Sequence, residues 1–154
     1  MANSQETEDR LAIRDVIERY TVSVTRRDWD AMGACFHLES RWRTSPPFSH
    51  DFSTRQGIQE GISGAVSSSD FLVQMTHGVT IDELTADRAK ATVVLNEMGR
   101  RSGAKTGLFL LGVYHDTLTK IDGRWGFEER YFEAYYVDTG WLPGQVLVDY
   151  ASRR

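Results

Sequence analysis

The sequence predicts an α+β fold in which helices come first and a curved antiparallel sheet follows. Apolar residues in segment 7–25 recur three and four positions apart, which is typical of one face of an amphipathic helix. In the second half, four segments are rich in β-branched and aromatic residues, as strands are: 77–84, 88–98, 106–120 and 124–137. Because the helices and strands are segregated along the chain, the order favours α+β over a doubly wound parallel sheet.

Polar residues delimit the elements of the first half. Residues 1–7 are expected to be disordered, and the long helix is expected over 7–25. Asp28 is a candidate N-cap for a short second helix over 29–36, because its carboxylate can accept from a backbone N–H of the first turn. A strand, a Pro-containing loop and a third helix are then predicted at 40–44, 45–53 and 56–66.

Two short turns connect the predicted strands of the second half. One turn is expected at 85–87, and Asp122-Gly123 separates the last two strands. Asp-Gly between two strand-like runs is a strong hairpin signal, because both turn positions need a positive φ. At that hairpin, Tyr114 and Trp125 are expected on opposite faces of the sheet.

The composition is that of a globular domain, and it excludes several classes of protein. With 154 residues, 40% of them hydrophobic, one domain over 1–154 is expected. The net charge of −4 and the scattered Lys and Arg residues argue against nucleic-acid binding. No apolar run reaches the roughly 18 residues of a membrane span, and the polar, acidic start of the chain does not predict a signal peptide.

The sequence contains no recognisable motif for binding a metal or a cofactor. The single cysteine, Cys35, excludes an internal disulfide and a cysteine metal cluster, and it suits a cytoplasmic protein. The four histidines lack metal-site spacing, and no glycine-rich phosphate loop is present. We therefore expect neither a cofactor nor a metal.

Three segments together resemble the SnoaL-like branch of the NTF2-like superfamily, which includes polyketide cyclases, scytalone dehydratase and a dehydrochlorinase. They are Ile17-Glu-Arg-Tyr20 through Asp30, Met75-Thr-His-Gly78, and Gly112-Val-Tyr-His-Asp116 followed by 121–127 and Arg130. The resemblance implies a cone-shaped α+β fold, with a curved antiparallel sheet wrapped around a long N-terminal helix. A pocket for a small apolar or aromatic molecule would open between them.

Strand alternation and the resemblance together suggest which residues line that pocket. If Tyr114 faces inward, so do Leu110, Gly112 and Asp116, whereas His115 faces away. The residues expected to contact a ligand are Tyr20, Trp42, Leu95, Leu110, Tyr114 and Phe132. The two tyrosines could donate a phenolic hydrogen bond to a ligand oxygen, or they could only pack against the ligand as part of the cavity wall.

The resemblance assigns the catalytic base to His77, although a hydrogen-bonded structural histidine is an equally simple interpretation. The sequence departs from the family at Thr25, where catalytic members carry the aspartate that orients this histidine. Thr25 is still expected to line the cavity as a catalytic residue, because its hydroxyl could hydrogen-bond the ring. Glu97 has inward parity and could replace that aspartate by pairing with His77 or Arg130, unless it is solvated. His50 lies in the Pro-containing loop and could be a lid contact, although exposure to solvent is the simpler interpretation.

Arg130 is the fourth expected catalytic residue, because its fork of donors could hold a leaving anion or a substrate carboxylate. The alternative is a structural salt bridge with Glu97, Glu128 or Glu133.

Three functions remain open. The first is a cofactor-free lyase or isomerase that abstracts a proton from a ring-containing apolar substrate. The second is a non-catalytic ligand-binding or accessory protein, which the threonine at position 25 favours. The third is a scaffold like the small subunit of ring-hydroxylating dioxygenases. We also expect a homodimer through the outer sheet face, where Phe109, Leu111 and Val113 would otherwise form an exposed apolar patch.

Overall fold

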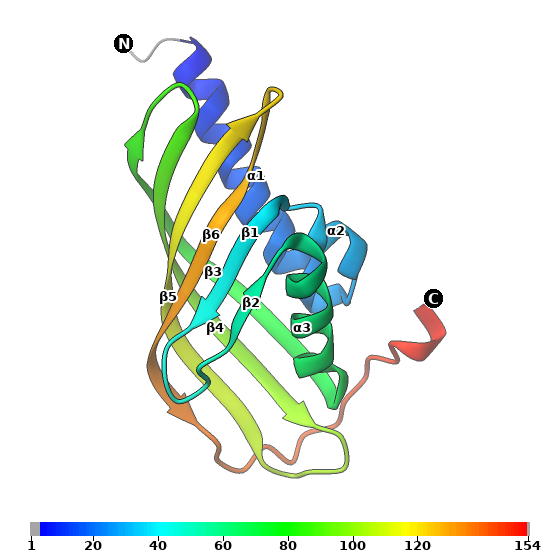
Figure 1. The fold of residues 1–154 in the computed structure, drawn as a ribbon. Coiled ribbons are helices and arrows are strands. Elements are labelled where there is room, and N and C mark those ends of the chain that lie inside the picture. The colour runs from blue at the N-terminus through cyan, green and yellow to red at the C-terminus, as the bar shows by residue number, and fades with distance from the viewer. Residues whose placement is uncertain (1–3, 154) are drawn as a thin grey trace.

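The computed structural model describes residues 4–153 (Figure 1). Its helices are α1 (Ser4–Arg26), α2 (Trp29–Gly33) and α3 (Arg55–Ser67), with a short 3-10 helix, η1, at Ala151–Arg153. The strands are β1 (Phe36–Thr44), β2 (Asp51–Ser53), β3 (Ser69–Leu84), β4 (Arg88–Arg101), β5 (Gly107–Ile121) and β6 (Arg124–Asp138). The predicted order of helices before long strands is confirmed.

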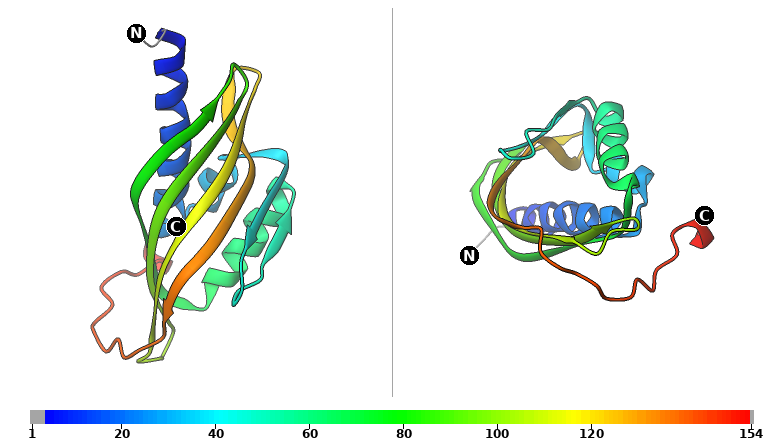
Figure 2. Two further views of the ribbon diagram at one scale, coloured as in Figure 1. Left: turned by 90° about the vertical axis from the view of Figure 1, so that its left-hand side faces the viewer. Right: turned by 90° about the horizontal axis from the view of Figure 1, so that it is seen from below.

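The six strands form one curved sheet in the order β2-β1-β6-β5-β4-β3. Strands β3 to β6 pair antiparallel, as predicted, whereas β1 runs parallel to β6, so the whole sheet is mixed. Figure 2 shows α1 lying along the concave side of this sheet, with α2 and α3 beside it. This arrangement confirms the predicted α+β cone.

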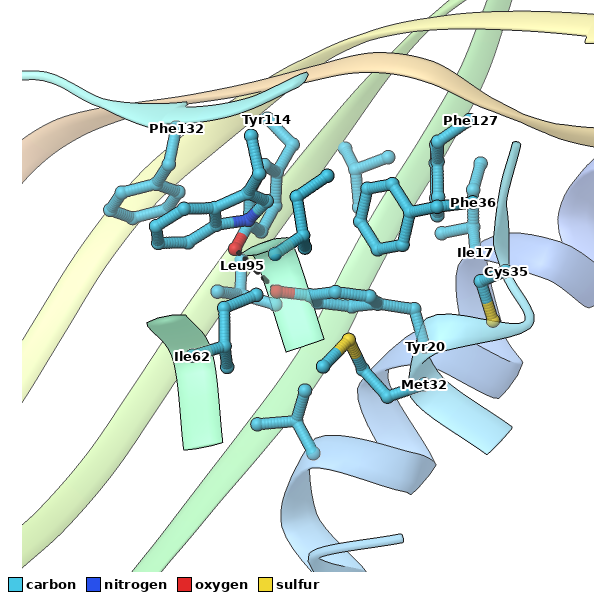
Figure 3. Close-up of a cluster of buried hydrophobic side chains, with 14 of the residues drawn as sticks. Ile17, Tyr20, Met32, Cys35, Phe36, Ile62, Leu95, Tyr114, Phe127 and Phe132 are labelled. Atoms are coloured by element: carbon cyan, nitrogen blue, oxygen red, sulfur yellow. Dashed lines mark hydrogen bonds between the residues drawn. The ribbon is translucent and has the colours of Figure 1, made fainter. Parts of the chain in front are cut away.

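The core forms where one face of α1 meets the inner face of the sheet. Ile13, Ile17 and Tyr20 are fully buried. The Tyr20 ring packs edge-on against Phe36 and Phe127, with centroids 5.9 and 6.0 Å apart (Figure 3). Cys35 is buried nearby, and burial raises the pKa of its thiol to about 11, so it behaves as a small apolar side chain.

Several predicted boundaries were wrong. Helix α1 begins at Ser4, so residues 4–7 are helical rather than disordered, and residues 1–3 lie outside the described residues. Helix α2 ends at Gly33 and β3 already begins at Ser69. The start of β3 is set by pairing with the end of β4, a contact between distant parts of the chain that local propensity does not reveal.

Two register shifts decide which side chains point inward. In β6, Thr117 pairs with Glu129 and Leu118 pairs with Phe127, so Glu128 is an extra residue. Such a bulge reverses the alternation beyond it, and Phe127 and Arg130 therefore both face the core. The expectation for Trp125 was wrong for another reason. The two-residue Asp122-Gly123 turn pairs Trp125 with Lys120, which alternates onto the Tyr114 side of β5, so the buried Trp125 side chain lies on the same face as Tyr114.

The second shift is in β3, where Thr76 pairs with Leu95 and Gly78 pairs with Val94. His77 is the extra residue between them. It points away from the core and is exposed.

Among residues 4–153, no helix is long and apolar enough to cross a membrane.

Candidate active site

A cavity of about 440 Å³ lies between the inner face of the sheet, the end of α1 and helix α3. Its walls are mainly aliphatic and aromatic, which suits a small apolar molecule. All six residues expected to contact a ligand lie on this wall: Tyr20, Trp42, Leu95, Leu110, Tyr114 and Phe132. Ile62 of α3 completes the wall on the opposite side (Figure 3).

Two phenol groups meet at one part of the cavity wall. The hydroxyl oxygens of Tyr20 and Tyr114 are 3.4 Å apart (Figure 3). Burial raises the pKa of both phenols, so both keep their protons at neutral pH. The side chain of Trp42 is also buried on this wall, and its contact with Tyr114 opposes the rise that burial causes in the pKa of that phenol. This corner of the cavity therefore offers hydrogen-bond donors to a ligand oxygen.

A buried ion pair lies behind the two phenols. Arg130 donates to both carboxylate oxygens of Asp116 over 2.9 and 3.1 Å, and both side chains are completely buried. The guanidinium carbon lies 3.9 Å from the ring centroid of Tyr114 and 4.3 Å from those of Tyr20 and Phe127. Cation–π contact of this kind explains how the aromatic core accommodates a charge.

Arg130 is therefore not a cavity-lining residue, and its expected placement there was wrong. Its carboxylate partner is Asp116 rather than Glu97, Glu128 or Glu133. The positive charge acts on the cavity indirectly, because it opposes the rise that burial causes in the pKa of Tyr20 and Tyr114. Both phenols are thereby better donors than burial alone would make them.

A carboxylate lies on the β4 part of the same wall. Glu97 lines the cavity, and its Oε2 accepts a 2.7 Å hydrogen bond from Nε2 of Gln74. Burial raises the pKa of Glu97, and the Gln74 contact only partly opposes this. The inward direction of Glu97 is as expected, but its hydrogen bond goes to Gln74, and neither His77 nor Arg130 contacts it directly.

Thr25 lies outside this cavity. Its Oγ1 accepts a 3.0 Å hydrogen bond from the backbone N–H of Gln74, which ties the end of α1 to β3. Thr25 instead borders a second hollow, between the C-terminal segment and the outer face of β3 and β4. The expectation that Thr25 lines the ligand cavity was therefore wrong.

His77 also lies outside the cavity, because the bulge in β3 turns its exposed side chain outward. The expected placement of His77 depended on the resemblance, which does not reveal a bulge in this chain. The only histidine on the cavity wall, among the described residues, is His50. Its ring stacks on Phe52, with centroids 5.5 Å apart.

The profile of the SnoaL-like domain matches residues 5–131 of the chain. The chain belongs to the SnoaL-like family. A search of curated protein sequences gave no significant match.

Solved structures share this SnoaL-like fold at low sequence identity. A hexachlorocyclohexane dehydrochlorinase, LinA-type3 from Novosphingobium barchaimii, is 15% identical with a TM-score of 0.82, over 96% of this chain and 99% of its own. A protein proposed to be a scytalone dehydratase, from Novosphingobium aromaticivorans, is 18% identical with a TM-score of 0.79, over 89% and 91%. At these identities the likeness establishes the fold alone.

Three residues of this SnoaL-like site were missed by sequence analysis. Gln74 was missed because β3 was expected to start at residue 77, after it. His50 was assigned to a solvent-exposed loop, but that loop folds over the cavity. Asp116 had the correct inward parity, and its pairing with Arg130 could have been recognised only with the bulge at Glu128 in place.

Replacing Glu97 with glutamine is expected to stabilise this SnoaL-like protein at neutral pH. The unfolded carboxyl group ionises near its ordinary pKa of 4.5, whereas burial raises the folded pKa. The free energy of unfolding of the wild type therefore falls as the pH rises from the unfolded pKa through the folded one. Glutamine cannot ionise and can still accept from Gln74.

Urea unfolding at several pH values measures this difference. The gain of the variant should be present at about pH 7 and absent at about pH 3, where the carboxyl group is protonated in both states. An equal change at both pH values would contradict the assignment to ionisation of Glu97.

Proposed function

We propose that this SnoaL-like protein is a cofactor-free lyase or isomerase that removes a proton from a small ring-containing apolar molecule. One observation carries the proposal. A carboxylate with a raised pKa, Glu97, shares a mostly apolar cavity with two protonated phenols that have a buried arginine behind them. Pairs of groups whose environments separate their pKa values in this way are typical of acid–base sites.

In the proposed reaction, ionised Glu97 accepts the proton from a carbon next to a ligand carbonyl. The electron pair of the broken C–H bond moves to the carbonyl oxygen and forms an enolate, to which Tyr114 or Tyr20 donates a hydrogen bond. The enolate then either expels a leaving group from the β-carbon, as a lyase, or takes the proton back at another carbon, as an isomerase. Gln74 holds the Glu97 carboxylate in place through its amide.

Glu97 replaces His77 as the proposed base because it lies inside the cavity and His77 does not. The dehydrochlorinase and the proposed scytalone dehydratase that share the fold support the lyase class. Among the described residues, His50 is the histidine on the cavity wall, and its replacement by glutamine provides the comparison with Glu97.

A non-catalytic binding protein is the second candidate. Among the residues that the structure describes, the cavity wall holds no histidine–carboxylate pair, since His77 faces outward and residue 25 is a threonine, and this favours the second candidate. The same cavity would then hold a ligand without changing it.

Hydrogen–deuterium exchange separates the two candidates without knowledge of the natural substrate. The protein is incubated in D₂O with small cyclic ketones such as tetralones and indanones, and deuterium next to the carbonyl is measured by mass spectrometry. Ligand-observed NMR measures binding in the same samples. Exchange above the buffer rate supports the enzyme, and binding without exchange supports the second candidate. Absence of binding across the panel would contradict both.

We also propose that two copies of the chain associate through the outer face of the sheet. Val94, Phe109, Leu111 and Tyr136 are between 37% and 52% exposed, whereas Val113, which was expected to be exposed there, is buried. The pairing of β4, β5 and β6 brings them close together on that face. Such a contiguous apolar surface is typical of an interface.

The change Leu111→Glu is expected to convert the dimer into a monomer in sedimentation velocity at micromolar concentration, because a second copy would bury the new charges. Leu11→Glu is the matched control, since Leu11 is an exposed leucine on α1 and not on the sheet. A wild-type protein that is already monomeric would overturn the proposal.

A further inference from the structure

The cavity differs in chemistry between its aromatic part and one rim. The rim is formed by the start of β3, the turn between β4 and β5 and the segment after β6, which lie at one end of the sheet (Figure 1). Its polar side chains are four hydroxyl groups and two guanidinium groups: Ser68, Ser69, Thr106, Thr139, Arg100 and Arg101. The rim is therefore a cluster of hydrogen-bond donors at the entrance to an apolar cavity.

Within the part of the chain that the structure describes, the guanidinium of Arg101 is unpaired. Among residues 4–153, no hydrogen bond, ion pair or ring contact involves its side chain. Arg100 is different, because its Nη1 donates to the carbonyl oxygens of Leu142 and Gly144 over 2.9 and 2.7 Å and its Nη2 lies 3.5 Å from Asp70. Arg100 thus anchors the C-terminal segment, whereas Arg101 is free to bind a ligand.

Among the described residues, no carboxylate of the cavity wall lies close enough to Arg101 to form an ion pair with it. Glu97 is the only acidic residue on the wall among the described residues, and it lies on the same strand. Residues 97, 99 and 101 alternate onto the inner face, so Arg101 lies about 13 Å along the strand from Glu97. The residue between them is Gly99, whose Cβ would come within 2.9 Å of the Phe71 carbonyl oxygen. The wall between the carboxylate and the guanidinium is therefore kept free of a side chain.

We propose that the ligand of this cavity is an amphiphilic anion: a ring-containing apolar body carrying a carboxylate or sulfonate group, which Arg101 binds at the rim. The apolar body lies against the aromatic wall, and the anionic group receives charge-assisted hydrogen bonds from the guanidinium and the neighbouring hydroxyls. Arg101 is a specificity-determining residue in this arrangement. The inference rests on the cavity being the ligand site, as proposed above, and does not require that the ligand be chemically changed.

Two fluorescent probes that differ in one group test this inference. Anilinonaphthalene sulfonate is an anion, and phenylnaphthylamine has the same rings without the sulfonate. The wild type is expected to bind the sulfonate more tightly. Arg101→Ala should weaken sulfonate binding about ten-fold, the effect of losing one charge-assisted hydrogen bond, and leave binding of the neutral probe unchanged.

Two controls complete the experiment. Arg124→Ala removes an exposed arginine at the β5–β6 turn and should change neither affinity. Leu110→Trp and Ile62→Trp each place bulk in the cavity and should weaken binding of both probes, and either one suffices if the other does not fold.

The outcomes separate the two proposals. Equal loss of both probes in Arg101→Ala, or no loss of the sulfonate, overturns the anion proposal while the cavity remains a ligand site. Probe binding that neither tryptophan variant affects shows that the probes bind elsewhere, and it overturns the cavity as the ligand site as well.

Discussion

Replacing Asp116 with asparagine is expected to lower the free energy of unfolding by about 3–5 kcal/mol, because a buried charge then loses its partner. Arg130 would keep its positive charge in a site from which water is excluded, since both side chains are completely buried. The rings of Tyr20, Tyr114 and Phe127 would contribute only cation–π attraction, which is about 2 kcal/mol when desolvated. That attraction is too weak to replace a bidentate carboxylate.

Urea unfolding followed by circular dichroism measures the effect. Asp51→Asn is the matched control, because Asp51 makes a similar contact with Arg41 but both side chains are about half exposed. Exposed pairs contribute roughly 0–1 kcal/mol. The double change Asp116→Leu with Arg130→Met should recover much of the loss, since an apolar pair leaves no buried charge. A cost of Asp116→Asn no larger than that of Asp51→Asn would contradict the account of the ion pair.

Replacing Glu97 with glutamine is expected to reduce deuterium exchange into a bound cyclic ketone by about 10²–10⁴-fold, the usual contribution of a general base. Glutamine has nearly the same shape and can still accept from Gln74, so ligand affinity should be retained. In the wild type, exchange should increase as the pH rises through the raised pKa of Glu97, because only the ionised carboxylate accepts a proton. The variant should not show this increase.

The exchange rate and the dissociation constant are measured on the same samples, so that loss of chemistry is distinguished from loss of binding. Glu83→Gln is the control, since Glu83 is exposed and pairs with Lys90 at the surface. If Glu97→Gln retains exchange and His50→Gln abolishes it, the base is the histidine of the loop over the cavity and the role proposed for Glu97 is wrong.

The fold could be predicted because its main signals are local. Helical spacing of apolar residues along α1 and the Asp122-Gly123 turn each depend on a few neighbouring residues. The alternation of side chains between the two faces of a strand without a bulge also predicted correctly which residues face inward. It placed Leu110 and Tyr114 on the inner face of β5, and Leu95 and Glu97 on the inner face of β4. Neither segment contains a bulge that would reverse the alternation.

The tertiary structure decided the remainder of the site through two bulges. His77 is itself the extra residue of the bulge in β3 and points outward. The extra residue of β6, Glu128, turned Arg130 inward to meet Asp116. A bulge accommodates the bending of a sheet, and that bending depends on how the sheet packs around a helix distant in sequence. No short window of the sequence contains that information, so the sequence by itself determined the elements and the cavity, while the curvature of the sheet selected which charged side chains face it.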